Sequence, residues 1–207
     1  MKQSLLAVLA VASTSAACHA ALLKYTMVGT GIAGSVGTTA FTGATLTVTW
    51  SRDTATAAAP FSSQNANLAT QGIVVPTPTI SIASAAGNWA GSMLLGQGIS
   101  QWQAVTALFL TNPQQSQIVM NGTSAGGPVC MFGLVGAGNG LFIDMVAPAS
   151  VSGAFGSDGG PFDSSFGTIA LDNSVGGNGT FTIAEVPAPG AAAMALVAGL
   201  VSRRRRR

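Results

Sequence analysis

Charged residues are scarce in this chain and unevenly placed. Lysine and arginine total eight, and aspartate and glutamate total six, among 207 residues. Five of the basic residues are the terminal arginines Arg203, Arg204, Arg205, Arg206 and Arg207. Between residues 21 and 185 the only cations are Lys24 and Arg52, against all six anions, so this segment carries a net charge of −4. A nucleic-acid-binding surface needs a cationic footprint, and nucleic acid is therefore not expected as a partner of the body.

The chain also lacks a long apolar run. The uncharged run near its end, from Gly190 to Val201, has twelve residues. As a helix it would be roughly 18 Å long, which is well short of a hydrocarbon core of ~30 Å. A permanent membrane span is not expected there, whereas a short, temporary one is.

The first twenty residues have the features of a secretory signal. Lys2 supplies a positive start, residues 5–12 are apolar, and small residues at Cys18 and Ala20 favour cleavage after Ala20. Cleavage removes His19, the only histidine, and leaves Cys130 as the only cysteine. The mature chain would then hold no imidazole base and no intrachain disulfide.

The end of the chain has three parts in a fixed order. Val186, Pro187, Ala188 and Pro189 come first, the apolar run follows, and the arginines come last. The prolines lock φ and remove backbone donors, so the chain there stays extended and accessible. Arginines beside an apolar segment stay on the cytoplasmic side of a membrane.

This three-part ending resembles the PEP-CTERM sorting signal of exported proteins in Gram-negative bacteria. Ala188 stands where the family's Val-Pro-Glu-Pro motif has glutamate, and the resemblance covers residues 186–207. It implies export by the Sec machinery and transient tethering to the inner membrane. It also implies processing by an exosortase-type membrane protease and delivery to the cell surface or extracellular matrix.

The body, residues 21–185, is predicted to be all-β and a single β-sandwich, of which the jelly roll is one form. Thr45, Thr47 and Thr49 alternate with Leu46, Val48 and Trp50, as in a half-buried strand. Other predicted strands cover residues 23–28, 79–83, 104–110, 117–120, 129–135, 141–146, 168–171 and 180–183. Asn-Gly pairs at 121–122, 139–140 and 178–179 predict turns. Residues 55–72 predict a loop with at most one short helix.

Two glycine motifs imitate catalytic or cofactor signatures. Gly29, Gly31 and Gly34 have the spacing of a dinucleotide-binding fingerprint, but no helix-forming residues follow, and a glycine-rich hairpin is predicted instead. Residues 122–126 spell a nucleophile elbow around Ser124, which without a histidine has no general base.

Two further sets of residues suggest binding. Asp158 and Asp163 are close enough in sequence to supply a calcium site on loops or, as a third alternative, the paired carboxylates of a glycosidase, but they first indicate a solvated turn. Trp89 and Trp102 lie among small or polar residues and could stack on sugar rings, although such tryptophans more often pack over a sheet edge.

The sequence thus predicts an exported, non-enzymatic surface or matrix protein without a cofactor. The alternative is an extracellular carbohydrate-binding module that associates with exopolysaccharide through Trp89 and Trp102.

Overall fold

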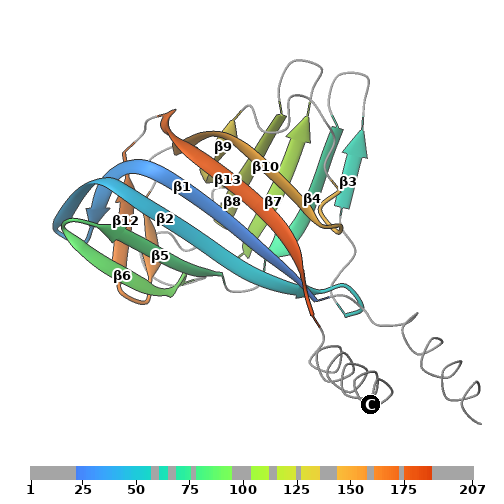
Figure 1. Ribbon diagram of the computed structural model, residues 1–207, viewed down its shortest axis with the longest axis horizontal. Coiled ribbons are helices and arrows are strands. Elements are labelled where there is room, and N and C mark those ends of the chain that lie inside the picture. The colour runs from blue at the N-terminus through green and yellow to red at the C-terminus, as the bar shows by residue number, and fades with distance from the viewer. Residues whose placement is uncertain are drawn as a thin grey trace, which may run out of the picture.

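The structure is a computed structural model that describes residues 22–56, 61–64, 69–75, 78–94, 104–111, 116–124, 127–135, 144–157, 161–172 and 175–187. In these ranges the regular structure is thirteen β-strands and no helix, which confirms the predicted all-β class (Figure 1). Accordingly, the described ranges contain no helix with the length and apolar character needed to cross a membrane.

All thirteen strands belong to one antiparallel sheet. Its main path runs β3-β4-β7-β8-β9-β10-β13-β1-β2-β5-β6, and β11 and β12 branch from β1. The strands are β1 (Leu22–Val36), β2 (Thr39–Asp53), β3 (Phe61–Gln64), β4 (Ala69–Val75), β5 (Thr79–Ser84), β6 (Gly87–Ser92), β7 (Ala104–Thr111), β8 (Ser116–Ser124), β9 (Gly127–Val135), β10 (Ala149–Ser157), β11 (Phe162–Ser164), β12 (Gly167–Leu171) and β13 (Val175–Val186).

The long β1–β2 hairpin lies inside this sheet, between β13 and β5. Its inward residues are buried and apolar, with Tyr25 opposite Trp50 and Met27 opposite Val48. The two strands are joined at Gly37 and Thr38, and Gly37 has a φ of 55°. Glycine adopts this left-handed conformation without strain, so it suits the tight turn that the sheet twist requires.

The hairpin predicted over Gly29 to Gly34 is wrong, because these residues lie inside β1. Register shifts between Thr30 and Ile32 and between Ile32 and Gly34 mark a bulge in the ladder to β2, and Gly31 there has a φ of 75°. A bulge bends a strand and increases its twist. Beyond it, β1 changes partner from β13 to β12.

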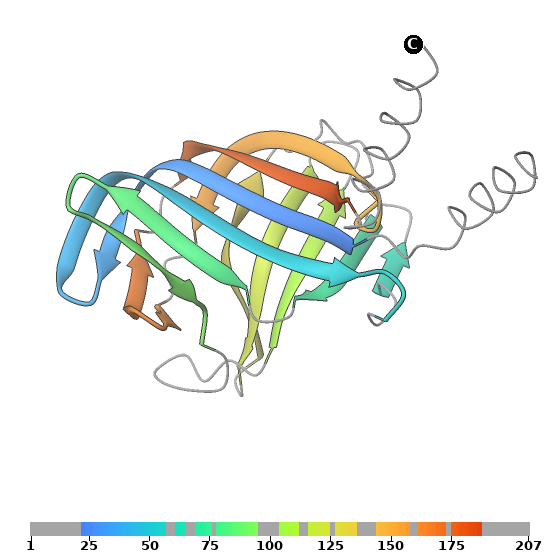
Figure 2. The same ribbon diagram turned by 60° about the horizontal axis from the view of Figure 1, so that its bottom comes forward.

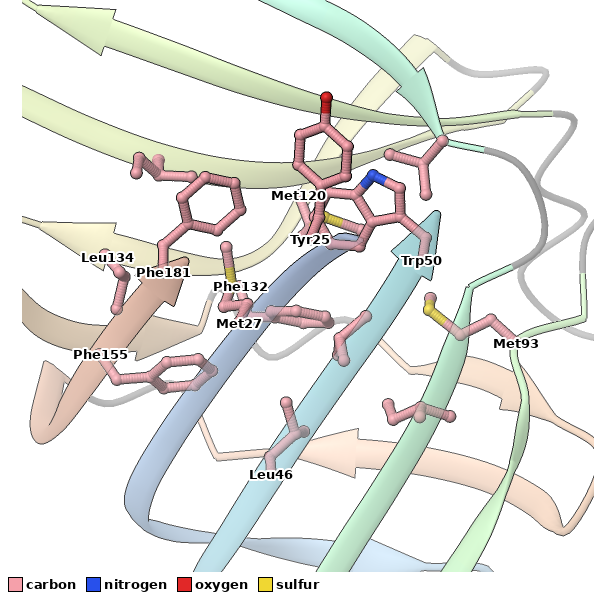
Figure 3. Close-up of a cluster of buried hydrophobic side chains, with 14 of the residues drawn as sticks. Tyr25, Met27, Leu46, Trp50, Met93, Met120, Phe132, Leu134, Phe155 and Phe181 are labelled. Carbon is pink, nitrogen blue, oxygen red and sulfur yellow. The ribbon is translucent and has the colours of Figure 1, made fainter. Parts of the chain in front are cut away.

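Figures 1 and 2 show that the sheet curls over itself, so that β4, β7, β8 and β9 lie across from β1, β2 and β5. Buried side chains from both groups of strands form one hydrophobic cluster. In Figure 3, Tyr25, Trp50 and Phe181 lie with Met120, Phe132 and Leu134 in this cluster. The core is therefore enclosed by a single continuous sheet.

Aromatic rings fill much of the core. Tyr25 and Trp50 stack with ring centroids 5.0 Å apart and planes 4° apart. The Phe132 ring stacks on the Phe155 ring, with ring centroids 5.9 Å apart. The Phe162 ring is tilted against Phe132, also with ring centroids 5.9 Å apart. Such pairs add about 0.5–1.5 kcal/mol beyond the burial of their area.

Backbone hydrogen bonds also join the end of β6 to the β11–β12 hairpin. Met93, just after β6, forms a bridge with Ser164, and the backbone N–H of Leu94 donates to the Asp163 carbonyl at 2.9 Å. The Ser165 N–H donates to the Ser92 carbonyl at 2.8 Å. Since β12 pairs with β1, the strands β1, β2, β5, β6, β11 and β12 form a closed circuit of hydrogen bonding.

Several predicted loops and turns are instead strands. Residues 55–72 contain β3 and the start of β4, so the predicted loop with one short helix is wrong. Asn121 and Gly122 lie within β8, and Asn178 and Gly179 within β13. The Asn-Gly pair at 139–140 lies outside the described residues. Residues 144–147 form a turn rather than the end of a strand, with the Val146 N–H donating to the Asp144 carboxylate at 3.0 Å.

Candidate functional site

The outer face of the sheet carries hydroxyl groups in rows that cross the strands. The alternation that buries Leu46 and Val48 turns Thr47 and Thr49 outward. One row joins six strands through directly paired residues, each exposed or half-buried: Ser150, Thr182, Thr26, Thr49, Thr79 and Ser92. A face of this composition is polar without being charged.

Neighbouring hydroxyls in this row can contact one another. The Thr49 and Thr79 Oγ atoms are 2.6 Å apart, and the Thr79 hydroxyl also donates to the Thr49 carbonyl at 3.2 Å. The next row holds Ser152, Thr180, Val28, Thr47, Ser81 and Ala90 in the same register.

An open groove of about 440 Å³ lies on this face where β10, β13 and β1 meet. Its polar lining comes from Thr30, Ser152, Asn178 and Thr180, and the rest comes from Val28, Gly153 and Gly179. None of these residues is charged. The groove therefore presents hydroxyl and amide groups, which both donate and accept hydrogen bonds, next to one aliphatic side chain.

Glycines at matched positions lie beneath the groove. Gly153 pairs with Gly179, which pairs in turn with Gly29, so three adjacent strands lack a side chain in one row. A Cβ at Gly29 would meet the Phe155 ring, and one at Gly179 would meet Leu134. The core packs directly against the backbone of Gly29 and Gly179, which explains why glycine is needed at these two positions although neither is a turn.

A buried polar group occurs at the end of the core near the start of β1. The Tyr25 hydroxyl donates to the Met145 carbonyl at 2.7 Å. Burial raises the pKa of Tyr25 above its ordinary value of 10.0, the Asp144 charge acts in the same direction, and hydrogen bonding and charge from Arg52 oppose the shift. Arg52 is itself buried, at 6% exposure. The Tyr25 ring stacks on Trp50, so its hydroxyl is held inside the core.

The aspartates predicted for calcium are only partly within the described residues. Asp163 lies on β11, is buried, and accepts a hydrogen bond of 2.8 Å from the Thr168 hydroxyl. Asp158 lies outside. Among the described residues, no group of three or more His, Cys, Asp or Glu side chains is placed to hold a metal ion.

Only one of the two tryptophans proposed for stacking on sugars lies within the described residues. Trp89, on β6, is half-buried and packs against the core, with its ring centroid 6.1 Å from that of Phe41. Trp89 therefore contributes part of its ring to the core. Trp102 lies outside the described residues.

The start of β1 and the end of β13 lie side by side. Leu22, the first residue of β1, pairs with Val186, the last residue of β13, and Pro187 follows as an exposed residue (Figure 1). The predicted cleavage site at Ala20 lies outside the described residues, as do Ala188, Pro189, and the arginines Arg203, Arg204, Arg205, Arg206 and Arg207.

No family model, curated protein or solved structure matches this chain.

Sequence reasoning missed the groove because it missed β10. The segment Ala149–Ser157 is rich in serine, glycine and alanine and has few of the large β-forming residues that signal a strand. Its alternation of serine with Val151 and Gly153 was the available signal. Thr180 and Thr182 on β13 showed the same pattern.

Proposed function

We propose that this chain is an exported, non-enzymatic protein of the cell surface or extracellular matrix, sorted by a PEP-CTERM-like signal that an exosortase-type protease processes. The observation that carries the proposal is the position of the folded body. Its first described strand begins at Leu22, two residues after the predicted cleavage site at Ala20, and its last strand ends at Val186, where the sorting motif starts. The described strands thus lie within the segment that would remain after both signals are removed.

The proposal includes a β-sandwich body formed by one curled sheet. Burial of residues from β1, β2 and β5 together with those of β8 and β9 in a single cluster supports it. The non-enzymatic part rests on the absence of histidine after residue 20 and on the structural contacts of Tyr25 and Asp163.

The test is the mass of the mature protein together with its location. We expect a chain that begins at Ala21, has lost Arg203–Arg207, and is found outside the inner membrane. A Pro187→Ala/Pro189→Ala variant should keep its tail and stay at the membrane. Released protein that still carries the five arginines would contradict the sorting proposal.

The alternative of a carbohydrate-binding module is also supported, although at a different place from Trp89. The uncharged groove between β10, β13 and β1 offers hydrogen-bonding groups suited to a sugar.

A further inference from the structure

From the groove and the hydroxyl rows, we propose that the outer face of β10, β13 and β1 binds an uncharged polysaccharide. The ligand would be an extended chain of neutral sugars that lies across the strands. This inference rests on the proposed function, since only an exported protein would meet such a polymer.

The chemistry of the groove selects a neutral, hydroxyl-rich ligand. A sugar hydroxyl both donates and accepts, and so do the hydroxyls of Ser152 and Thr180 and the Asn178 amide. Neither the Ser152 nor the Thr180 hydroxyl is hydrogen-bonded to another described residue, so both are available. The Thr30 hydroxyl donates to the Asn178 carbonyl at 3.1 Å, and its oxygen can still accept.

Charge argues against the competing polymers. No charged residue lines the groove, so it offers no counter-charge for phosphate or uronate groups and no charge complementarity to nucleic acid. Val28 is half-buried in the groove and can contact the C–H face of a sugar ring.

The spacing of the rows fits a repeating ligand. Antiparallel strands lie about 4.8 Å apart, which is close to the length of one sugar in an extended glycan. Ser152, Thr180 and Val28 occupy one row across the three adjacent strands β10, β13 and β1. Successive sugars can therefore meet successive strands.

The glycines fix the shape of the site. Because Phe155 and Leu134 pack directly against the backbone of Gly29 and Gly179, the groove is held from within. A site that is formed before binding loses less conformational freedom when its ligand arrives.

The experiment compares two double variants of the full chain in detergent solution. Ser152→Ala/Thr180→Val removes two groove hydroxyls and leaves the strand-forming shape of residue 180. Thr47→Val/Ser81→Ala makes the same chemical change on the same face outside the groove lining. Binding is measured against dextran, a linear β-glucan and mannan as neutral probes, and against alginate as an acidic probe.

We expect at least one neutral glycan to bind and alginate not to bind. The groove variant should bind about tenfold more weakly, as expected from the loss of two neutral hydrogen bonds, and the matched variant should bind within about twofold of the original chain. Thermal unfolding of both variants at the same temperature as the original chain would show that the fold is retained.

Three results would overturn the inference. The first is no binding to any neutral glycan, and the second is equal binding by the groove variant and the original chain. The third is loss of binding in an additional Trp89→Ala variant but not in the groove variant. These outcomes are separable from failure of the proposed function. A protein that is processed and released but binds no glycan refutes only the groove, whereas a glycan-binding protein with an intact arginine tail refutes only the sorting.

Discussion

At the scale of single residues, the core depends on contacts between aromatic rings and bare backbone. Phe155 lies where a side chain at Gly29 would be, and Leu134 where one at Gly179 would be. Tyr25 brings a hydroxyl into the same core and satisfies it with the Met145 carbonyl. These positions should respond sharply to small changes in volume or charge.

Replacing Gly29 with alanine should lower the free energy of unfolding by about 1–3 kcal/mol, because the new Cβ would overlap the Phe155 ring. Urea unfolding measures this loss. The double variant Gly29→Ala/Phe155→Leu should lose less than the sum of the two single changes, since the smaller side chain makes room. Strict additivity would show that the two residues do not press on each other.

Tyr25 should make the protein lose stability at high pH. Its pKa is raised in the folded state, so the folded protein keeps the proton that the unfolded chain releases near pH 10. The stabilising contribution of this shift is complete below pH 10 and is lost as pH rises through the folded pKa. Urea unfolding at a series of pH values checks this, with Tyr25→Phe as the variant that should lose the dependence.

The same residue can be observed directly. It is the only tyrosine in the chain, so the ultraviolet absorbance of phenolate reports its titration alone. A midpoint at or below 10 in the native protein would contradict the effect of burial.

At the scale of elements, the β11–β12 hairpin closes the circuit of six strands through few contacts. The Ser164 hydroxyl donates to the Gly167 carbonyl at 2.6 Å, and the Thr168 hydroxyl donates to the buried Asp163 carboxylate at 2.8 Å. The bridge from Met93 to Ser164 depends on this hairpin being in place. This junction between β6 and the β11–β12 hairpin, here called the seam, should therefore open more readily than the β1–β2 hairpin.

Thr168→Val should weaken the seam, because a buried carboxylate loses a hydrogen-bond donor, at a cost of about 1–3 kcal/mol. Thr168→Ser keeps the hydroxyl and should behave as the original chain does. Amide hydrogen exchange at Leu94 and Ser165 should speed up in the valine variant more than exchange at Met27 in β1. A uniform change across all amides would mean that the hairpin does not open by itself.

Elements with regular alternation could be predicted from the sequence, and those without it could not. Thr45 to Trp50 and Thr180 to Ile183 each showed a buried and an exposed face, and both lie in strands. The segment from Ala149 to Ser157 gave little signal because most of its residues are small. Phe155, its only aromatic residue, fills the space where a side chain at Gly29 would lie. The groove itself depends on pairing between β10 and β13, which no local pattern encodes.

Glycine was the main source of error. Gly31 and Gly179 both suggested turns, because glycine permits positive φ. Gly31 does have a positive φ, but within a bulge of β1, while Gly179 is required by close packing from Leu134. One sequence does not distinguish these uses of glycine, since each depends on residues distant in the chain.

At the scale of the whole molecule, charge separates the body from its ends. The full chain has an isoelectric point of about 8.8, yet the segment between the predicted signals carries a net charge of −4. The basic character belongs to the arginines at the end. Processing should therefore reverse the sign of the net charge at neutral pH.

Isoelectric focusing can follow this change. The mature protein should focus in the acidic range, and a variant lacking only residues 203–207 should already be acidic before processing. A mature protein that focuses near the value of the full chain would show that the arginines are retained.

The pairing of Leu22 with Val186 has a mechanical consequence. Because β1 and β13 run antiparallel and their outer ends are neighbours, a force pulling the two ends apart would break the ladder one hydrogen bond at a time, like a zipper. A protein attached at both termini would therefore unfold at low force. Held at one end only, its interior would carry no load, so release of either terminus protects the fold from tension.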